Sequence, residues 1–90
     1  MTENEIFTKN LILSTEFDRY ILEHLDFAEK VPLNAQVVLL PEDDQELCKI
    51  NIEISERQLE KGQHVVHVHI GGVEPQISRL KDVSIEVKVA

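Results

Sequence analysis

An uninterrupted apolar run, Val37-Val38-Leu39-Leu40, lies near the middle of the 90-residue sequence. A short apolar run without polar alternation is typical of a β-strand that is covered on both faces. Helical periodicity follows over residues 44–61, and residues 64–70 then alternate as a second strand would. Strand, helix and strand within about 35 residues match the size of a parallel β-α-β crossover, which is right-handed in nearly all proteins. We therefore predict parallel pairing of residues 37–40 with residues 65–70.

A first helix is predicted over residues 3–24, which contain neither Gly nor Pro. Thr2 and Glu5 have the spacing of a capping box, so Thr2 is the expected N-cap. Apolar side chains cover roughly half of the helix circumference at about 100° per residue. They are Ile6, Phe7, Leu11, Leu13, Phe17, Tyr20, Ile21, Leu22 and Leu25. Because a helix on one sheet needs only about 100° of apolar arc, we expect this helix to touch the sheet and also a second helix or a second subunit.

The rest of the chain suggests shorter elements. Residues 26–31 predict one helical turn ended by Pro32, and residues 76–81 predict another. Residues 83–89 alternate apolar and polar side chains, the period-two pattern of a half-exposed edge strand. The predicted fold class is therefore α/β: a single domain over residues 1–90, two-layered or sandwich-like, in the order α-β-α-β-β. It contains a right-handed parallel β-α-β unit and a three-stranded sheet.

The composition limits the size of the core and the kinds of partner. Aromatic residues make up 4% of the chain and Trp is absent, so the core must consist of Ile, Leu and Val. Such a small core is only marginally stable alone, and oligomerisation would add buried apolar area. The formal charge of −8 repels phosphate backbones. We therefore expect no direct binding to nucleic acid.

The compartment is predicted from the cysteine count and from the first residues. Cys48 is the single cysteine and cannot form an internal disulfide, while Met1 to Glu5 lack the basic start and apolar run of a signal peptide. No apolar run approaches the roughly 20 residues that span a bilayer. We expect a cytoplasmic protein without membrane contact.

Acidic residues follow the first strand at the place where open α/β sheets usually bind ligands. Carboxylates at Glu42, Asp43 and Asp44 are suitable ligands for Mg²⁺. Asp43 also stands three residues before Glu46, so capping of the second helix by Asp43 is the favoured interpretation. No glycine-rich phosphate loop occurs at this junction, which disfavours nucleotide binding.

His67 and His69 project from the same face of the second strand, a spacing that metal sites use. The pair is incomplete as a metal site, since at least one more ligand is needed; His24, His64 and the carboxylates are candidates. The alternative is that both are ordinary histidines at a surface or a subunit interface. We predict that they are exposed to solvent or to such an interface, because residues 83–89 imply a sheet with one partly wet face.

Small polar rows lie within the apolar arcs of both long helices: Asn10, Ser14 and Asp18 in the first, Asn51 and Ser55 in the second. If buried, these groups need hydrogen-bond partners. The rows therefore face each other, face a symmetry mate, or line a wet pocket. Cys48 is adjacent to this face and is interpreted as a small buried apolar residue rather than a nucleophile.

Two stretches, from Asn10 to His24 and from Val37 to Leu47, resemble a family of small bacterial and archaeal proteins classed only as a domain of unknown function. The resemblance covers about the first two-thirds of the chain and implies no activity, cofactor or site. Where that family has His followed by Pro at the end of the first helix, this chain has His24-Leu25. The end of the helix is therefore expected to be less sharp here.

The leading functional hypothesis is a non-catalytic, self-associating interaction or regulatory module. We predict a homodimer in which the first helix contributes Phe7, Leu11 or Leu22 to the contact. Two alternatives stay open: a metal-binding protein or metal-dependent enzyme that uses His67 and His69, and a small-ligand binder at the C-terminal end of the 37–40 strand. The sequence identifies no catalytic residue or cofactor.

Overall fold

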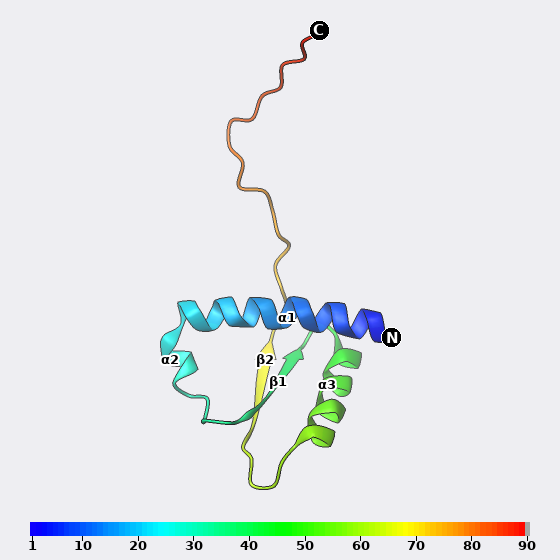
Figure 1. The fold of residues 1–90 in the computed structure, drawn as a ribbon, viewed down its shortest axis with the longest axis vertical. Coiled ribbons are helices and arrows are strands. Elements are labelled where there is room, and N and C mark those ends of the chain that lie inside the picture. Colours follow the sequence, from blue (N-terminus) through cyan, green and yellow to red (C-terminus); the bar gives the residue numbers. More distant parts are fainter. Residues whose placement is uncertain (90) are drawn as a thin grey trace.

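Two parallel strands form the centre of the fold. The computed structural model describes residues 1–89, in which β1 (Gln36–Pro41) pairs with β2 (Val65–Ile70). The register places Gln36 opposite Val65 and Pro41 opposite Ile70. The predicted parallel pairing is therefore confirmed, and α3 (Gln45–Gln58) makes the connection (Figure 1).

The apolar core lies between α3 and one face of this strand pair. Val38 and Leu40 pack with Cys48 and Ile52, and Leu47 is only 1% exposed. Because side chains alternate along a strand, the odd-numbered residues of β1 point to the opposite face of the sheet.

The first helix, α1 (Glu3–Glu23), runs across the C-terminal ends of the strands (Figure 1). Thr2 is its N-cap, since the Thr2 hydroxyl accepts a hydrogen bond of 3.2 Å from the Glu5 amide. The helix ends at His24, and the short helix α2 (Leu25–Ala28) follows directly. Of the 21 residues of α1 only Leu13 is buried. The helix therefore has little cover within its own chain.

The predicted cap of α3 is wrong by one residue. Asp44, not Asp43, is the N-cap, and its carboxylate accepts a hydrogen bond of 3.1 Å from the Leu47 amide. The cause is that β1 extends through Pro41, so that the turn delays the helix until Gln45. Lys9 of α1 donates a 2.7 Å hydrogen bond to the same carboxylate, which joins the two helices. The pKa of Asp44 is lowered, first by Lys9 and then by the Leu47 amide.

The end of α3 also differs from the prediction. The helix stops at Gln58 rather than at residue 61, and Leu59 is already extended. Gly62 directly follows the predicted helix, at the place where an αL glycine commonly terminates one. In the structure Gly62 instead lies in the loop before β2, where its φ of +79° suits glycine.

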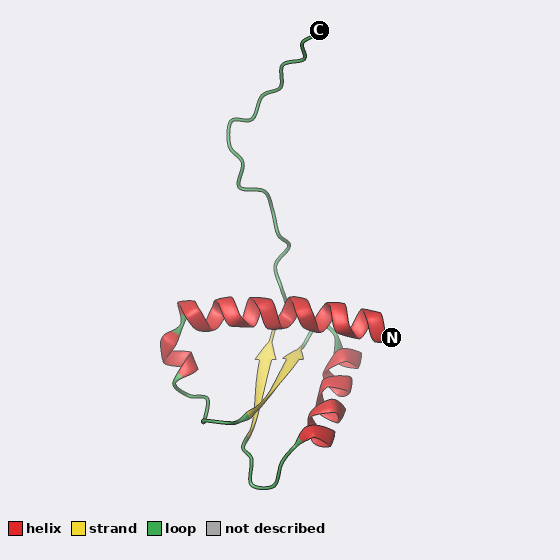
Figure 2. Cartoon of the chain, in the orientation of Figure 1, coloured by secondary structure: helices red, strands yellow, loops and turns green. Residues whose placement is uncertain are grey.

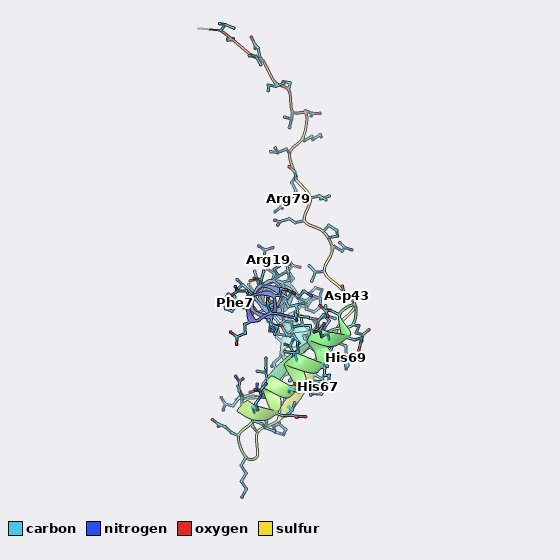
Figure 3. The ribbon with its side chains drawn as sticks, turned by 90° about the vertical axis from the view of Figure 1, so that its right-hand side faces the viewer. Phe7, Arg19, Asp43, His67, His69 and Arg79 are labelled. Carbon is cyan, nitrogen blue, oxygen red and sulfur yellow. The ribbon has the colours of Figure 1, made fainter. Side chains whose placement is uncertain are left out.

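The predicted three-stranded sheet and the order α-β-α-β-β are not what the structure shows. Residues 71–89, here called the arm, contain neither the predicted helical turn at 76–81 nor a paired strand at 83–89 (Figure 2). Within residues 1–89 the order is α1, α2, β1, α3, β2, and the two strands form one sheet. The arm runs away from the helices and strands, and Figure 3 shows Arg79 clear of them. In the part of the chain that the structure describes, no strand lies beside the arm.

The arm also sets the size of the molecule. The radius of gyration is 18.5 Å, compared with roughly 12 Å for a compact chain of this length. None of the helices within residues 1–89 combines the length and the apolar character needed to cross a bilayer.

The corrected cap gives a test of the α1–α3 junction. Asp44→Ala should lower the denaturation midpoint, because it removes both the cap and the partner of Lys9. Asp43→Ala is the matched control and should leave the midpoint unchanged. Since the folded pKa of Asp44 is lowered, its stabilisation is present above the unfolded value of about 3.9 and is lost as the pH falls through the folded value. Equal midpoints of the two variants in chemical denaturation near neutral pH would contradict this assignment.

Candidate interaction surface

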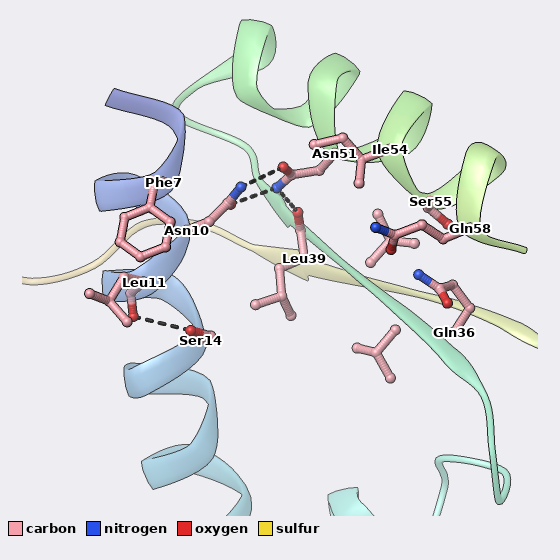
Figure 4. Close-up of a pocket in the computed structure, with 12 residues that line it drawn as sticks. Phe7, Asn10, Leu11, Ser14, Gln36, Leu39, Asn51, Ile54, Ser55 and Gln58 are labelled. Atoms are coloured by element: carbon pink, nitrogen blue, oxygen red, sulfur yellow. Dashed lines mark hydrogen bonds between the residues drawn. The ribbon is translucent and has the colours of Figure 1, made fainter. Parts of the chain in front are cut away.

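An asparagine pair ties three elements together. Asn10 of α1 and Asn51 of α3 exchange hydrogen bonds of 2.9 and 3.0 Å through their side-chain amides (Figure 4). Asn51 Nδ2 also donates to the Leu39 carbonyl of β1 at 2.9 Å. The two polar rows therefore face each other at this position, as one of the sequence interpretations proposed.

The other members of the rows are not joined in this way. Ser14 donates its hydroxyl to the Leu11 carbonyl one turn earlier, at 3.1 Å, and Asp18 is exposed. Ser55 is buried on α3. Ser14 and Asp18 thus stay accessible to groups outside the chain.

The outer edge of β1 is largely closed to another strand. The Gln36 amide donates to the His64 carbonyl, and the Glu42 amide donates to the Ile70 carbonyl. The backbone N–H and C=O groups of the even-numbered residues of β1 therefore point to β2, and those of the odd-numbered residues point to the outer edge. On this outer edge the Leu39 carbonyl accepts from Asn51, and Pro41 has no amide hydrogen. The Pro41 carbonyl accepts from the Asp44 amide at 3.0 Å. A further strand finds few free groups here.

A hollow of about 370 Å³ lies beside this edge, between α1 and α3 (Figure 4). Its apolar lining residues are Phe7, Leu11, Val37, Val38, Leu39 and Ile54. Phe7 is 69% exposed and Leu11 is 53% exposed, so both stand at the rim rather than in a core. An apolar rim of this kind favours contact with another apolar surface.

A second hollow, of about 620 Å³, lies on the β2 side of α1. Three aromatic rings form part of its wall: the ring of Phe27 meets those of Tyr20 and Phe17 edge to face, at 5.4 and 6.2 Å between centroids. Val68 and Ile70 of β2 complete the apolar lining, and the arm begins here. The hollow therefore adjoins both the C-terminal half of β2 and the start of the arm.

The predicted contact residues Phe7, Leu11 and Leu22 are all exposed on α1, Leu22 at 75%. At about 100° per residue these side chains lie within about 60° of the helix circumference. Leu25, 65% exposed, is the first residue of α2, directly after the end of α1 at His24. We call Phe7, Leu11 and Leu22, together with the adjoining Leu25, the apolar stripe.

The predicted metal pair is exposed on β2. His67 lies opposite Val38 and His69 opposite Leu40, and both imidazoles are accessible. Nδ1 of His69 is 3.4 Å from a carboxylate oxygen of Glu42. Across residues 1–89 no group of three His, Cys, Asp or Glu side chains is placed to hold a metal ion. The structure thus supplies no third ligand for this pair.

Two of the acidic residues beyond β1 are paired with cations at the start of α1. The Asp44 carboxylate is paired with Lys9, and the N-terminal ammonium of Met1 lies 3.2 Å from the Glu46 carboxylate. The predicted ligand-binding end of the 37–40 strand is therefore partly covered by helix α1 and its cations.

Cys48 has the properties of a structural residue. It is 9% exposed, and its thiol donates to the Pro41 carbonyl at 2.9 Å. Burial raises the pKa of the thiol, and the nearby carboxylates Asp44, Glu42 and Asp43 raise it further. Because the thiolate is the reactive form, the raised pKa disfavours a nucleophilic role.

The fold defines the class: a mixed α/β domain with one parallel β-α-β unit and exposed apolar surface on its longest helix. Residues 5–83 match the model of a family of unknown function, DUF5647, and the chain belongs to that family. The match includes thirteen residues beyond the end of β2, so the family's extent covers most of the arm. Searches against curated proteins and against solved structures find no significant match.

The asparagine tie can be tested by truncating each partner. Asn51→Ala should lower the free energy of unfolding by about 1–3 kcal/mol, because it leaves Asn10 and the Leu39 carbonyl without their partner. Asn10→Ala should lower the free energy of unfolding by less, since the Leu39 carbonyl keeps Asn51 as its donor. Gln58 lines the same hollow, and its side chain has no hydrogen-bond partner within residues 1–89. The control Gln58→Ala should therefore change the free energy of unfolding by less than about 0.5 kcal/mol. Urea unfolding of the three variants measures the differences, and an Asn51→Ala cost no greater than that of Gln58→Ala would contradict the tie.

Proposed function

We propose that this protein is a cytoplasmic, non-catalytic interaction module that works as a homodimer, with α1 at the contact. The observation that carries the proposal is that the 21-residue helix α1 buries only Leu13. Amphipathic helices in proteins owe most of their stability to packing of the apolar face. A second copy supplies that packing for the apolar stripe.

The apolar stripe has the self-complementary pattern that a two-fold symmetric contact requires. Its apolar residues lie near the two ends of α1, and Ser14 and Asp18 lie between them. In an antiparallel pairing of two α1 helices about position 16, Phe7 lies beside the C-terminal end of the partner's α1, near Leu22 of the partner subunit. In the same arrangement Ser14 meets Asp18 of the partner subunit, so that the exposed polar side chains of the two helices face each other. Each contact then occurs twice, as in every isologous interface.

The charge and the energetics favour an apolar contact of this kind. The net charge of −8 makes two copies repel at long range, so attraction must come from burial of apolar area. Removing one large apolar side chain from water contributes roughly 1.5–3 kcal/mol.

A chain with a single cysteine and a raised thiol pKa suits a reducing compartment.

The dimer is tested by placing a charge on the apolar stripe. Sedimentation equilibrium of the unmodified chain should give twice the chain mass of 10.3 kDa at micromolar concentrations. Phe7→Lys should shift the protein towards the monomer, because a buried ammonium is costly.

Thr8→Lys adds the same charge to the next position of α1, outside the stripe, and should leave the association unchanged. Circular dichroism checks that both variants keep their helices. A monomeric unmodified chain at high micromolar concentration would overturn the proposal.

A further inference from the structure

The end of the arm has the side-chain pattern of a strand, and within residues 1–89 no strand lies beside it. Val83, Ile85, Val87 and Val89 are 71%, 89%, 82% and 94% exposed. They alternate with the polar residues Ser84, Glu86 and Lys88, so that one side of an extended segment is apolar and the other polar. An exposed segment with this pattern is suited to adding to the edge of a sheet.

The outer edge of β2 is the free edge of the sheet. The backbone groups of the even-numbered residues of β2 are bonded to β1. The amides and carbonyls of the odd-numbered residues therefore point to the outer edge; these are Val65, His67 and His69. Within residues 1–89 none of these backbone groups has a hydrogen-bond partner. A two-stranded sheet is only marginally stable, and a third strand would satisfy this edge.

We infer that residues 83–89 of one copy add as a third strand to the outer edge of β2 in a second copy, and that the two copies exchange arms. This inference rests on the proposed function, since it names the segment that the partner contributes. Exchange of an identical element between copies is a low-cost route to a dimer.

The two faces of the added strand fit their surroundings. With its apolar side continuing the face of Val66, Val68 and Ile70, the strand adjoins the aromatic hollow beside Phe27. Its polar side then continues the face of β2 that carries His67 and His69. Glu86 thereby comes next to an imidazole, which is favourable whenever the ring is protonated.

The linker favours a second copy over a return to the same β2. A tight hairpin uses a loop of two to five residues, whereas twelve residues separate Ile70 from Val83. Pro75 holds Glu74 in extended backbone, and the arm leads away from the body (Figures 1 and 3). An extended linker of this length reaches roughly 40 Å. It is long enough to carry residues 83–89 from the end of one β2 to the sheet of a partner.

The test is an isotope-filtered NOE experiment on the full chain. Protein labelled with ¹³C and ¹⁵N is mixed with unlabelled protein, unfolded and refolded together, so that dimers contain one chain of each kind. Exchange predicts intermolecular NOEs between residues 83–89 of one chain and residues 65–69 of the other. Sedimentation of the same sample gives its oligomeric state.

The outcomes separate this inference from the proposed function. A dimer without arm-to-β2 NOEs, or with such NOEs only inside one chain, overturns the exchange and leaves the α1 dimer standing. A monomer overturns both.

A matched pair of variants adds a second measurement. Ile85→Lys should weaken dimerisation by on the order of tenfold or more, because it removes an apolar contact from each half of the dimer. Ser84→Lys, the same charge on the polar side of the same segment, should change the dissociation constant less than about twofold. Equal effects of the two variants would contradict the strand geometry.

Discussion

The parallel pairing of β1 with β2 determines where the rest of the chain can go. Parallel strands need a crossover, and α3 provides it while covering the face that contains Val38 and Leu40. The first helix, α1, crosses the C-terminal ends of the strands, and within residues 1–89 the far edge of β2 is left without a partner strand. Two strands and one crossover helix form only a small core. This core cannot cover all the apolar side chains of the chain, so part of the apolar surface stays exposed.

The asparagine tie explains how α1 is held while so little of it is buried. Asn51 connects α3 to the β1 backbone and to Asn10. Lys9, the neighbour of Asn10, makes a second link to Asp44, about two turns before Asn51. These polar links position α1 without using its apolar stripe. The helix is therefore fixed in orientation and free to present that stripe to another molecule.

Local patterns predicted most of the elements, because they depend on neighbouring residues only. The limits of α1 and the parallel pairing of residues 37–40 follow from periodicity and from the length of the crossover. Asp43 and Asp44 are adjacent acidic residues, and either could serve as the N-cap of α3. The path of the turn after Pro41 decides which of them does.

Contacts between distant residues were the harder part to predict. Asn10 and Asn51 are 41 positions apart, and the sequence left three possible partners for their rows. The alternation of residues 83–89 is plain in the sequence, yet alternation does not say which edge, or whose edge, the segment pairs with. Under the proposed exchange of arms, the pairing depends on groups that a second copy supplies, and a single chain does not show them.

Hydrogen exchange of the arm at two protein concentrations tests the account most directly. If a second copy supplies the sheet edge, alternate amides of residues 84–88 should exchange slowly in concentrated protein, since every second amide of an edge strand is bonded. Dilution below the dissociation constant should then remove this protection, together with that of the outward amides of β2. Fast exchange of the arm at all concentrations, or slow exchange that dilution does not alter, would contradict the account.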